Sequence, residues 1–122
     1  MHVMNKKIQI YILTIFISSC AFADKVGSVC IPDSTVFNDI LNCYLADYKK
    51  NDKILNEIYQ NKISNLSKRN KEKLRESQRD WIKEKEAVCV ADENEYGRES
   101  HFEAIKCQTE MTKERISFLK KY

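Results

Sequence analysis

The sequence predicts an all-α fold, a small up-down-up bundle of three helices cross-linked by two disulfides. Three observations support this prediction. The 122 residues include two glycines and one proline, whereas a β-sandwich needs many turns. Charged residues make up 32% of the chain, and runs of Lys, Glu, Asn and Gln favour helix surfaces. Apolar residues recur at helical spacing in three segments, which predicts three amphipathic helices.

The first 23 residues have the features of a secretory signal peptide. Two lysines precede an apolar run at residues 8–17, which is too short to span a bilayer. Ala21-Phe22-Ala23 follows as a small-x-small cleavage site, so we expect one mature domain at residues 24–122, in the periplasm or secreted. The competing interpretation is a lipobox in which Cys20 is lipidated, which would make the chain an outer-membrane lipoprotein. Contact with a membrane is expected only in that case.

Four cysteines remain after the signal peptide, an even number that is typical of an exported domain with two disulfides. They are Cys30, Cys43, Cys89 and Cys107. Judged by depth along the predicted helices, the favoured pairs among three possibilities are Cys43–Cys107 and Cys30–Cys89. Each would close a loop of about sixty residues and stabilise the fold by roughly 3–4 kcal/mol. No metal site is expected, because no two cysteines are two to four residues apart.

The first helix is predicted to begin after a cap at Asp33 or Ser34. The polar residues 49–53 interrupt its apolar row, so the helix is expected to bend there or to restart with Asp52 as a cap. Its predicted core row comprises Phe37, Leu41, Tyr44, Tyr48, Leu55, Ile58, Tyr59 and Ile63.

The second helix, which follows a polar connection at residues 64–70 and extends to about Ala91, is centred on Trp81, the only tryptophan. Leu74, Trp81 and Val88 recur every seven residues on an otherwise charged segment. Because a tryptophan buries more area than its neighbours, we expect Trp81 to nucleate the core. The expected core residues are Trp81, Leu74, Tyr59, Leu55 and Phe102.

The third helix follows a loop at residues 92–99 and is predicted to open with a capping box, with Ser100 as the N-cap and Glu103 three residues on. Its apolar side is expected to comprise Phe102, Ile105, Thr109, Thr112, Ile116 and Leu119. Short links between the three helices predict antiparallel neighbours.

Charge and motif content argue against several classes of function. Removal of the signal peptide lowers the formal charge from +3 to +1, with 19 basic and 18 acidic residues, which gives no reason to expect nucleic-acid binding. The chain has no glycine-rich phosphate loop. His101 is the only histidine of the mature chain, and the carboxylates alternate with Lys and Arg as on a solvated helix. We therefore expect neither an enzyme nor a cofactor.

The ordered motifs of the chain resemble those of the LprI family. They are Cys30-x12-Cys43, Leu55-Asn56-x-x-Tyr59, Gln78-Arg79-x-Trp81-Ile82, Cys89, Cys107, and Thr112 with Arg115 ahead of Leu119. The resemblance covers nearly the whole mature chain. One departure follows Trp81-Ile82, where the family tends to carry an aromatic residue, Arg and Asp, and this chain has Lys83-Glu84-Lys85-Glu86.

The resemblance implies a cell-envelope protein that binds a protein partner, and the family name implies that this partner is a lysozyme. Lysozymes of the common animal type are strongly basic, so an acidic surface would speed their association. The best candidate for such a surface is the acidic loop that contains Asp92, Glu93 and Glu95. Two alternatives remain: a structural or assembly protein of the envelope, expected to expose an apolar patch around Tyr96 and Phe102, and an immunity protein against a wall-degrading effector.

Overall fold

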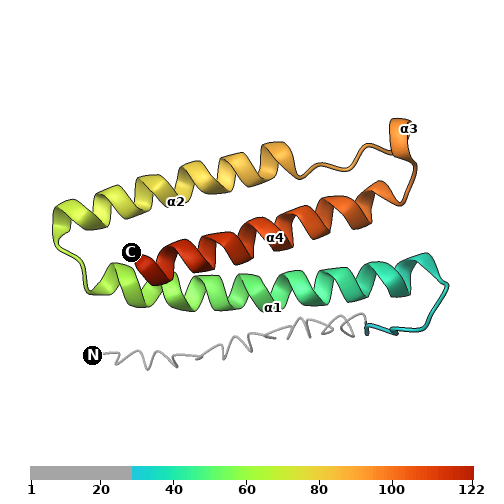
Figure 1. Ribbon diagram of the computed structural model, residues 1–122, viewed down its shortest axis with the longest axis horizontal. Coiled ribbons are helices and arrows are strands. Elements are labelled where there is room, and N and C mark those ends of the chain that lie inside the picture. Colours follow the sequence, from blue (N-terminus) through green and yellow to red (C-terminus); the bar gives the residue numbers. More distant parts are fainter. Residues whose placement is uncertain (1–28) are drawn as a thin grey trace, which may run out of the picture.

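A computed structural model describes residues 29–122 of the chain, so the predicted signal peptide and Cys20 lie outside the described part. Three long helices, α1 (Phe37–Ser64), α2 (Lys68–Val88) and α4 (Ser100–Lys121), form the body of the molecule, and α3 (Glu93–Tyr96) is a single turn. Figure 1 shows that α2 runs antiparallel to α1 and α4. No strand is present between residues 29 and 122. The predicted all-α, up-down-up architecture is confirmed.

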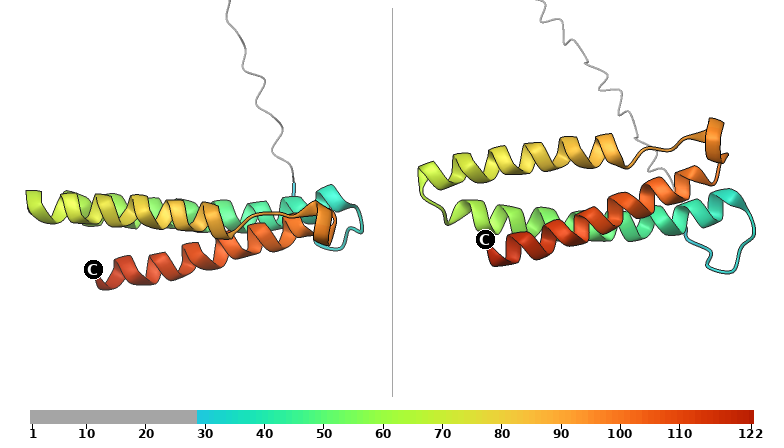
Figure 2. Two further views of the ribbon diagram at one scale, coloured as in Figure 1. Left: turned by 90° about the horizontal axis from the view of Figure 1, so that it is seen from above. Right: turned by 45° about the horizontal axis from the view of Figure 1, so that its top comes forward.

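The helices α1 and α4 run parallel and pack most closely along their lengths. Seen from above, α1 and α2 overlap while α4 lies to one side (Figure 2), so the three helices enclose a core instead of forming a flat layer. The buried apolar cluster comprises Leu55, Leu74, Ile116 and Leu119. These residues lie in the second half of α1, the first half of α2 and the last turns of α4, so the cluster is toward the end of the bundle that holds the α1–α2 connection and the C-terminus. Within the described residues, none of the helices is long and apolar enough to cross a membrane.

The helix α1 starts later than expected and runs without interruption. It begins at Phe37, after Val36 as the N-cap, whose side chain makes no capping bond. Ser34 contributes instead from outside the helix: its hydroxyl accepts a hydrogen bond from the Val36 N–H and donates one to Asp39, 2.6 Å away. The polar residues 49–53 neither break nor restart the helix, which continues to Ser64.

The start of α4 differs from the predicted capping box. Ser100 is the first residue of the helix, not its N-cap, and Glu99 in the N-cap position makes no side-chain capping bond. The Ser100 hydroxyl donates 2.7 Å back to the carbonyl oxygen of Gly97. Gly97 has a φ of +71°, a left-handed backbone conformation that glycine adopts at little steric cost. The chain therefore turns into α4 through a glycine bend.

The predicted disulfide pairing is wrong, although all four cysteines are paired. The bonds are Cys30–Cys43, with Cα atoms 4.4 Å apart, and Cys89–Cys107, with Cα atoms 5.4 Å apart. Each closes a short loop, with sequence separations of 13 and 18, instead of one of about sixty residues. The first ties the leading segment to α1, and the second ties the end of α2 to α4.

The reason lies in the rotational position of the cysteines on their helices. Phe102 stacks on Phe37 and Tyr44, with ring centroids 4.8 and 5.4 Å apart, so this side of α4 faces α1. At 3.6 residues per turn, Cys107 lies about 140° around α4 from Phe102, and Cys43 about 100° around α1 from Tyr44. Neither cysteine is therefore on the shared face. Depth along a helix was an insufficient guide to pairing.

The expected core residues divide into two groups. Leu55 and Leu74 are fully buried, and Tyr59 and Trp81 pack against the buried cluster while remaining partly exposed. Phe102 lies outside that cluster, in the stack with Phe37 and Tyr44. The predicted row that placed Val88 beside Trp81 is wrong at its end, since Val88 is 62% exposed and Lys85 is buried in its place.

Candidate functional site

The acidic loop predicted to bind a partner forms the end of the bundle around α3 (Figure 1). Asp92 is the N-cap of α3, and its Oδ1 accepts hydrogen bonds of 3.1 Å from the backbone N–H groups of Asn94 and Glu95. Such capping satisfies N–H groups that would otherwise lack a partner at the start of the helix. Asp92 therefore stabilises the turn at this end of the molecule and also contributes a negative charge to it.

Glu93 and Glu95 project from the same turn. The Glu93 carboxylate lies 2.5 Å from Nε2 of His101, which ties α3 to the first turn of α4. The neighbouring Glu95 carboxylate raises the pKa of Tyr96 above its ordinary value, with a smaller contribution from burial in the same direction. Both carboxylates are exposed, so the structure places all three predicted residues on one accessible edge.

Beside this edge is a hollow of about 560 Å³ with an apolar lining and exposed carboxylates at its rim. Its apolar lining includes Tyr44, Val90, Tyr96 and Phe102, and its rim carries Asp92, Glu99 and Glu103. Pockets that bind ligands commonly combine an apolar lining with a few polar groups that orient the occupant. The sequence prediction omitted Glu99 and Glu103, although their proximity to residue 95 in the chain was visible.

Charge is distributed unevenly along the bundle. Residues 92–103 carry five carboxylates and one arginine, a net charge of −4, while the remaining described residues carry 17 basic and 12 acidic side chains, a net charge of +5. A nearly neutral protein therefore has one strongly acidic end. Such local fields act on a charged partner within about 8–10 Å at physiological salt.

A second group of polar residues lies where α2 meets α4. Arg115 of α4 is 8% exposed; its Nε donates to Oε1 of Gln78 and its Nη2 donates to the hydroxyl of Ser77, both at 2.9 Å. The guanidinium also lies 4.4 Å from the ring centroid of Phe118. Burial lowers the pKa of Arg115, while Tyr59 and Tyr122 act in the opposite direction; an arginine nevertheless keeps its charge. No carboxylate within the described residues forms an ion pair with it.

Lys85 is a second buried cation that contacts Trp81. Its Nζ donates 2.8 Å to the hydroxyl of Tyr48 on α1 and lies 5.1 Å and 4.9 Å from the ring centroids of Tyr48 and Trp81. Cation–π contacts of this kind contribute roughly 0.5–2 kcal/mol. Trp81 thus links the three long helices through its contacts with Lys85, which bonds to α1, and with Arg115 of α4, 5.9 Å from its ring.

The motif residues on which the family resemblance depends therefore converge in space. Gln78, Trp81 and Arg115 form the polar cluster between α2 and α4, while Leu55, Leu74, Thr112 and Leu119 are fully buried. These positions hold the bundle together, and the acidic edge lies apart from them. Between residues 29 and 122, no group of three or more His, Cys, Asp or Glu side chains is arranged to hold a metal ion.

Comparison with known proteins identifies the family. The sequence model of the family described as lysozyme inhibitor LprI matches residues 30–119. No curated protein and no solved structure matches the chain. The family match covers most of the chain and includes all four paired cysteines and the clustered motif residues, and disulfides together with this family indicate an extracytoplasmic protein. The chain belongs to the LprI family of lysozyme inhibitors.

Proposed function

We propose that this protein is an exported inhibitor that binds a basic lysozyme through its acidic end. The observation that carries the proposal is the concentration of five carboxylates in residues 92–103, in a protein that is otherwise positively charged. An acidic surface attracts a basic enzyme during diffusion and can raise the association rate well above that of a neutral pair.

The hollow beside the edge supplies the second component of such an interface. Interfaces combine a desolvated apolar centre with a polar rim, and aromatic side chains often dominate the binding energy. Tyr96 is 66% exposed and Val90 is 64% exposed at the mouth of the hollow. A basic side chain of the partner can contact the rim while an apolar group enters between these two residues.

The test is inhibition of the lysis of a peptidoglycan suspension, with the oxidised chain from residue 24 and several lysozymes. The test variant reverses three edge charges: Glu95→Lys, Glu99→Lys and Glu103→Lys. The control variant, Glu57→Lys/Glu86→Lys/Glu114→Lys, changes the net charge by the same amount at exposed positions on other parts of the helices.

We expect dose-dependent inhibition by the parent protein and the control variant, and at least a tenfold higher inhibitor concentration for the edge variant, since each 1.4 kcal/mol of binding energy is a factor of ten. Equal loss in both variants would show that net charge alone matters. No inhibition of any lysozyme at excess protein would refute the proposal.

Export belongs to the same proposal. Two disulfides within a small domain fit an oxidising compartment, and the first 23 residues have the pattern of a cleaved signal peptide. Mass spectrometry of the protein from its native host tests this directly. A mature terminus at Asp24 supports soluble export, whereas a lipid-modified Cys20 would establish the lipoprotein alternative.

An assembly role in the envelope is the second candidate. It is favoured by exposed apolar side chains near the end of α2 and at α3, where Val88, Val90 and Tyr96 are each more than 60% exposed. Such a patch predicts self-association. Light scattering across a concentration series separates the two candidates, because a monomer at all concentrations contradicts self-assembly.

A further inference from the structure

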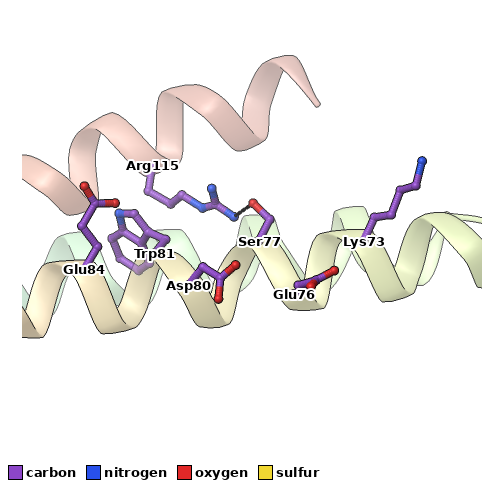
Figure 3. Close-up of a pocket in the computed structure, with 7 residues that line it drawn as sticks. All are labelled: Lys73, Glu76, Ser77, Asp80, Trp81, Glu84 and Arg115. Atoms are coloured by element: carbon purple, nitrogen blue, oxygen red, sulfur yellow. Dashed lines mark hydrogen bonds between the residues drawn. The ribbon is translucent and has the colours of Figure 1, made fainter.

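A second hollow, of about 460 Å³, opens between α2 and α4 at a distance from the acidic end, and Trp81 and Arg115 contribute to its lining (Figure 3). In Figure 3 the Arg115 guanidinium extends from α4 toward Ser77 of α2, and the indole ring lies next to it. The residues around it come from two long, disulfide-linked helices. The hollow is thus built on rigid elements.

Arg115 offers this hollow an unused hydrogen-bond donor. The residue is more than nine-tenths buried, and its Nε and Nη2 are occupied by Gln78 and Ser77. Its Nη1 has no hydrogen-bond partner among the described residues. Every fully buried side-chain nitrogen or oxygen of these residues does have such a partner. Nη1 therefore keeps some exposure to solvent, and because Arg115 lines the hollow, we place this donor there, where it can donate to a strong acceptor such as a carbonyl oxygen.

Trp81 supplies an apolar surface and a second donor. Its side chain is partly exposed at the hollow, and its indole Nε1 has no hydrogen-bond partner among the described residues. An aromatic ring has a negative face and a positive edge, so the face attracts weakly positive C–H groups. The ring of a sugar presents such C–H groups on one side and hydroxyl groups around its edge.

Three carboxylates line the α2 side of the hollow. Glu76, Asp80 and Glu84 recur every four residues, are exposed, and form no ion pair within the described residues. With Lys73 and Arg115, the lining carries a net charge of −1. The carboxylates disfavour a polyanion, and the buried arginine disfavours a polycation. The lining therefore suits a neutral ligand that both donates and accepts hydrogen bonds.

We propose that this hollow binds a neutral, N-acetylated amino-sugar glycan. A sugar ring lies against Trp81, its hydroxyl groups donate to the carboxylates of Asp80 and Glu84, and the amide oxygen of an N-acetyl group accepts from Nη1 of Arg115. This inference goes beyond the proposed inhibition and does not depend on it, because the hollow and the acidic end share no lining residue.

The test uses the intrinsic fluorescence of Trp81, which is unambiguous because the chain has one tryptophan. The oxidised protein is titrated with tri-N-acetylchitotriose and, in parallel, with maltotriose, which has hydroxyl groups but no amide. A saturable change in emission is expected with the first ligand, with a Kd of about 1 mM or lower, equivalent to roughly 4 kcal/mol. Absence of saturation up to about 10 mM, or an equal response to maltotriose, would overturn the proposal.

Variants locate the site. Asp80→Ala should weaken the binding of tri-N-acetylchitotriose by about fivefold, the effect of one lost hydrogen bond, whereas Glu86→Ala, elsewhere on the surface of α2, should leave it unchanged. Arg115→Lys keeps the charge and removes the guanidinium fork, so weaker binding by a folded variant supports the role of Nη1. If Arg115→Lys fails to fold by circular dichroism, the exposed Asp80 decides: unchanged binding by Asp80→Ala refutes the site.

Discussion

Removal of the Cys89–Cys107 disulfide provides a quantitative test of how the bundle is held together. The bond fastens the end of α2 to α4 across a sequence separation of 18. In the chain-entropy model, closing a loop of this length lowers the conformational entropy of the unfolded chain, which stabilises the fold by about 3 kcal/mol. The double variant Cys89→Ser/Cys107→Ser should therefore lose about 3 kcal/mol in its free energy of unfolding, which lowers the Tm by roughly 12–24 °C for a domain of this size.

Urea unfolding followed by circular dichroism at 222 nm gives the free energy, and the variant Cys30→Ser/Cys43→Ser serves as the comparison. Its shorter loop, with a separation of 13, predicts a similar loss of about 3 kcal/mol. Peptide mapping of the unreduced protein tests the pairing itself. Recovery of a Cys43–Cys107 peptide, or a loss well below 1 kcal/mol in the Cys89/Cys107 variant, would refute this account.

Three further predictions concern the core, the buried arginine and the acidic end. Leu119→Ala, at a position with no exposure, should cost about 2–5 kcal/mol in urea unfolding, whereas the exposed Val88→Ala should cost less than about 0.5 kcal/mol. Arg115→Ala should cost about 3–6 kcal/mol through two lost charge-assisted hydrogen bonds. Because no ion pair is lost, the cost should be the same in 1 M NaCl, and a strong salt dependence would contradict the structure. Since Glu95 raises the pKa of Tyr96, Tyr96 should ionise at higher pH than an ordinary tyrosine. The favourable interaction between Glu95 and neutral Tyr96 is therefore present below the usual tyrosine pKa and is lost as the pH rises through the pKa of Tyr96 in the folded protein. Glu95→Gln should shift the tyrosinate absorbance at 295 nm toward lower pH, and an unchanged titration would show that the contact is absent in solution.

Helix content and order were predictable because they depend on local patterns. Apolar spacing, scarce glycine and proline, and short polar links all indicated the same three helices, and the structure has them. The acidic edge was also predictable, since Asp92, Glu93 and Glu95 are neighbours in the sequence. The disulfide pairing was not predicted correctly, because it depends on how far each helix is rotated about its axis, and depth along the axis does not contain that information.

The buried cations Lys85 and Arg115 show why the polar cluster around Trp81 was not predicted from the sequence. Leu74, Gln78, Trp81, Lys85 and Cys89 follow one another at spacings of four, three, four and four residues, so Lys85 occupies the inward row of α2 by position alone. Its side-chain type predicted an exposed position, because lysine is almost never fully buried without a partner. Its partners are the hydroxyl and ring of Tyr48 on α1 and the ring of Trp81, four residues earlier on α2. The spacing along α2 gives the contact with Trp81, but it does not specify how α1 packs and so does not give the contact with Tyr48. Arg115 is likewise an inward-facing cation on α4, and its partners Gln78 and Ser77 lie on the neighbouring helix α2. On a short helical bundle, helical position is therefore the better guide to burial, and a cation on an inward row indicates an aromatic or amide partner on the neighbouring helix.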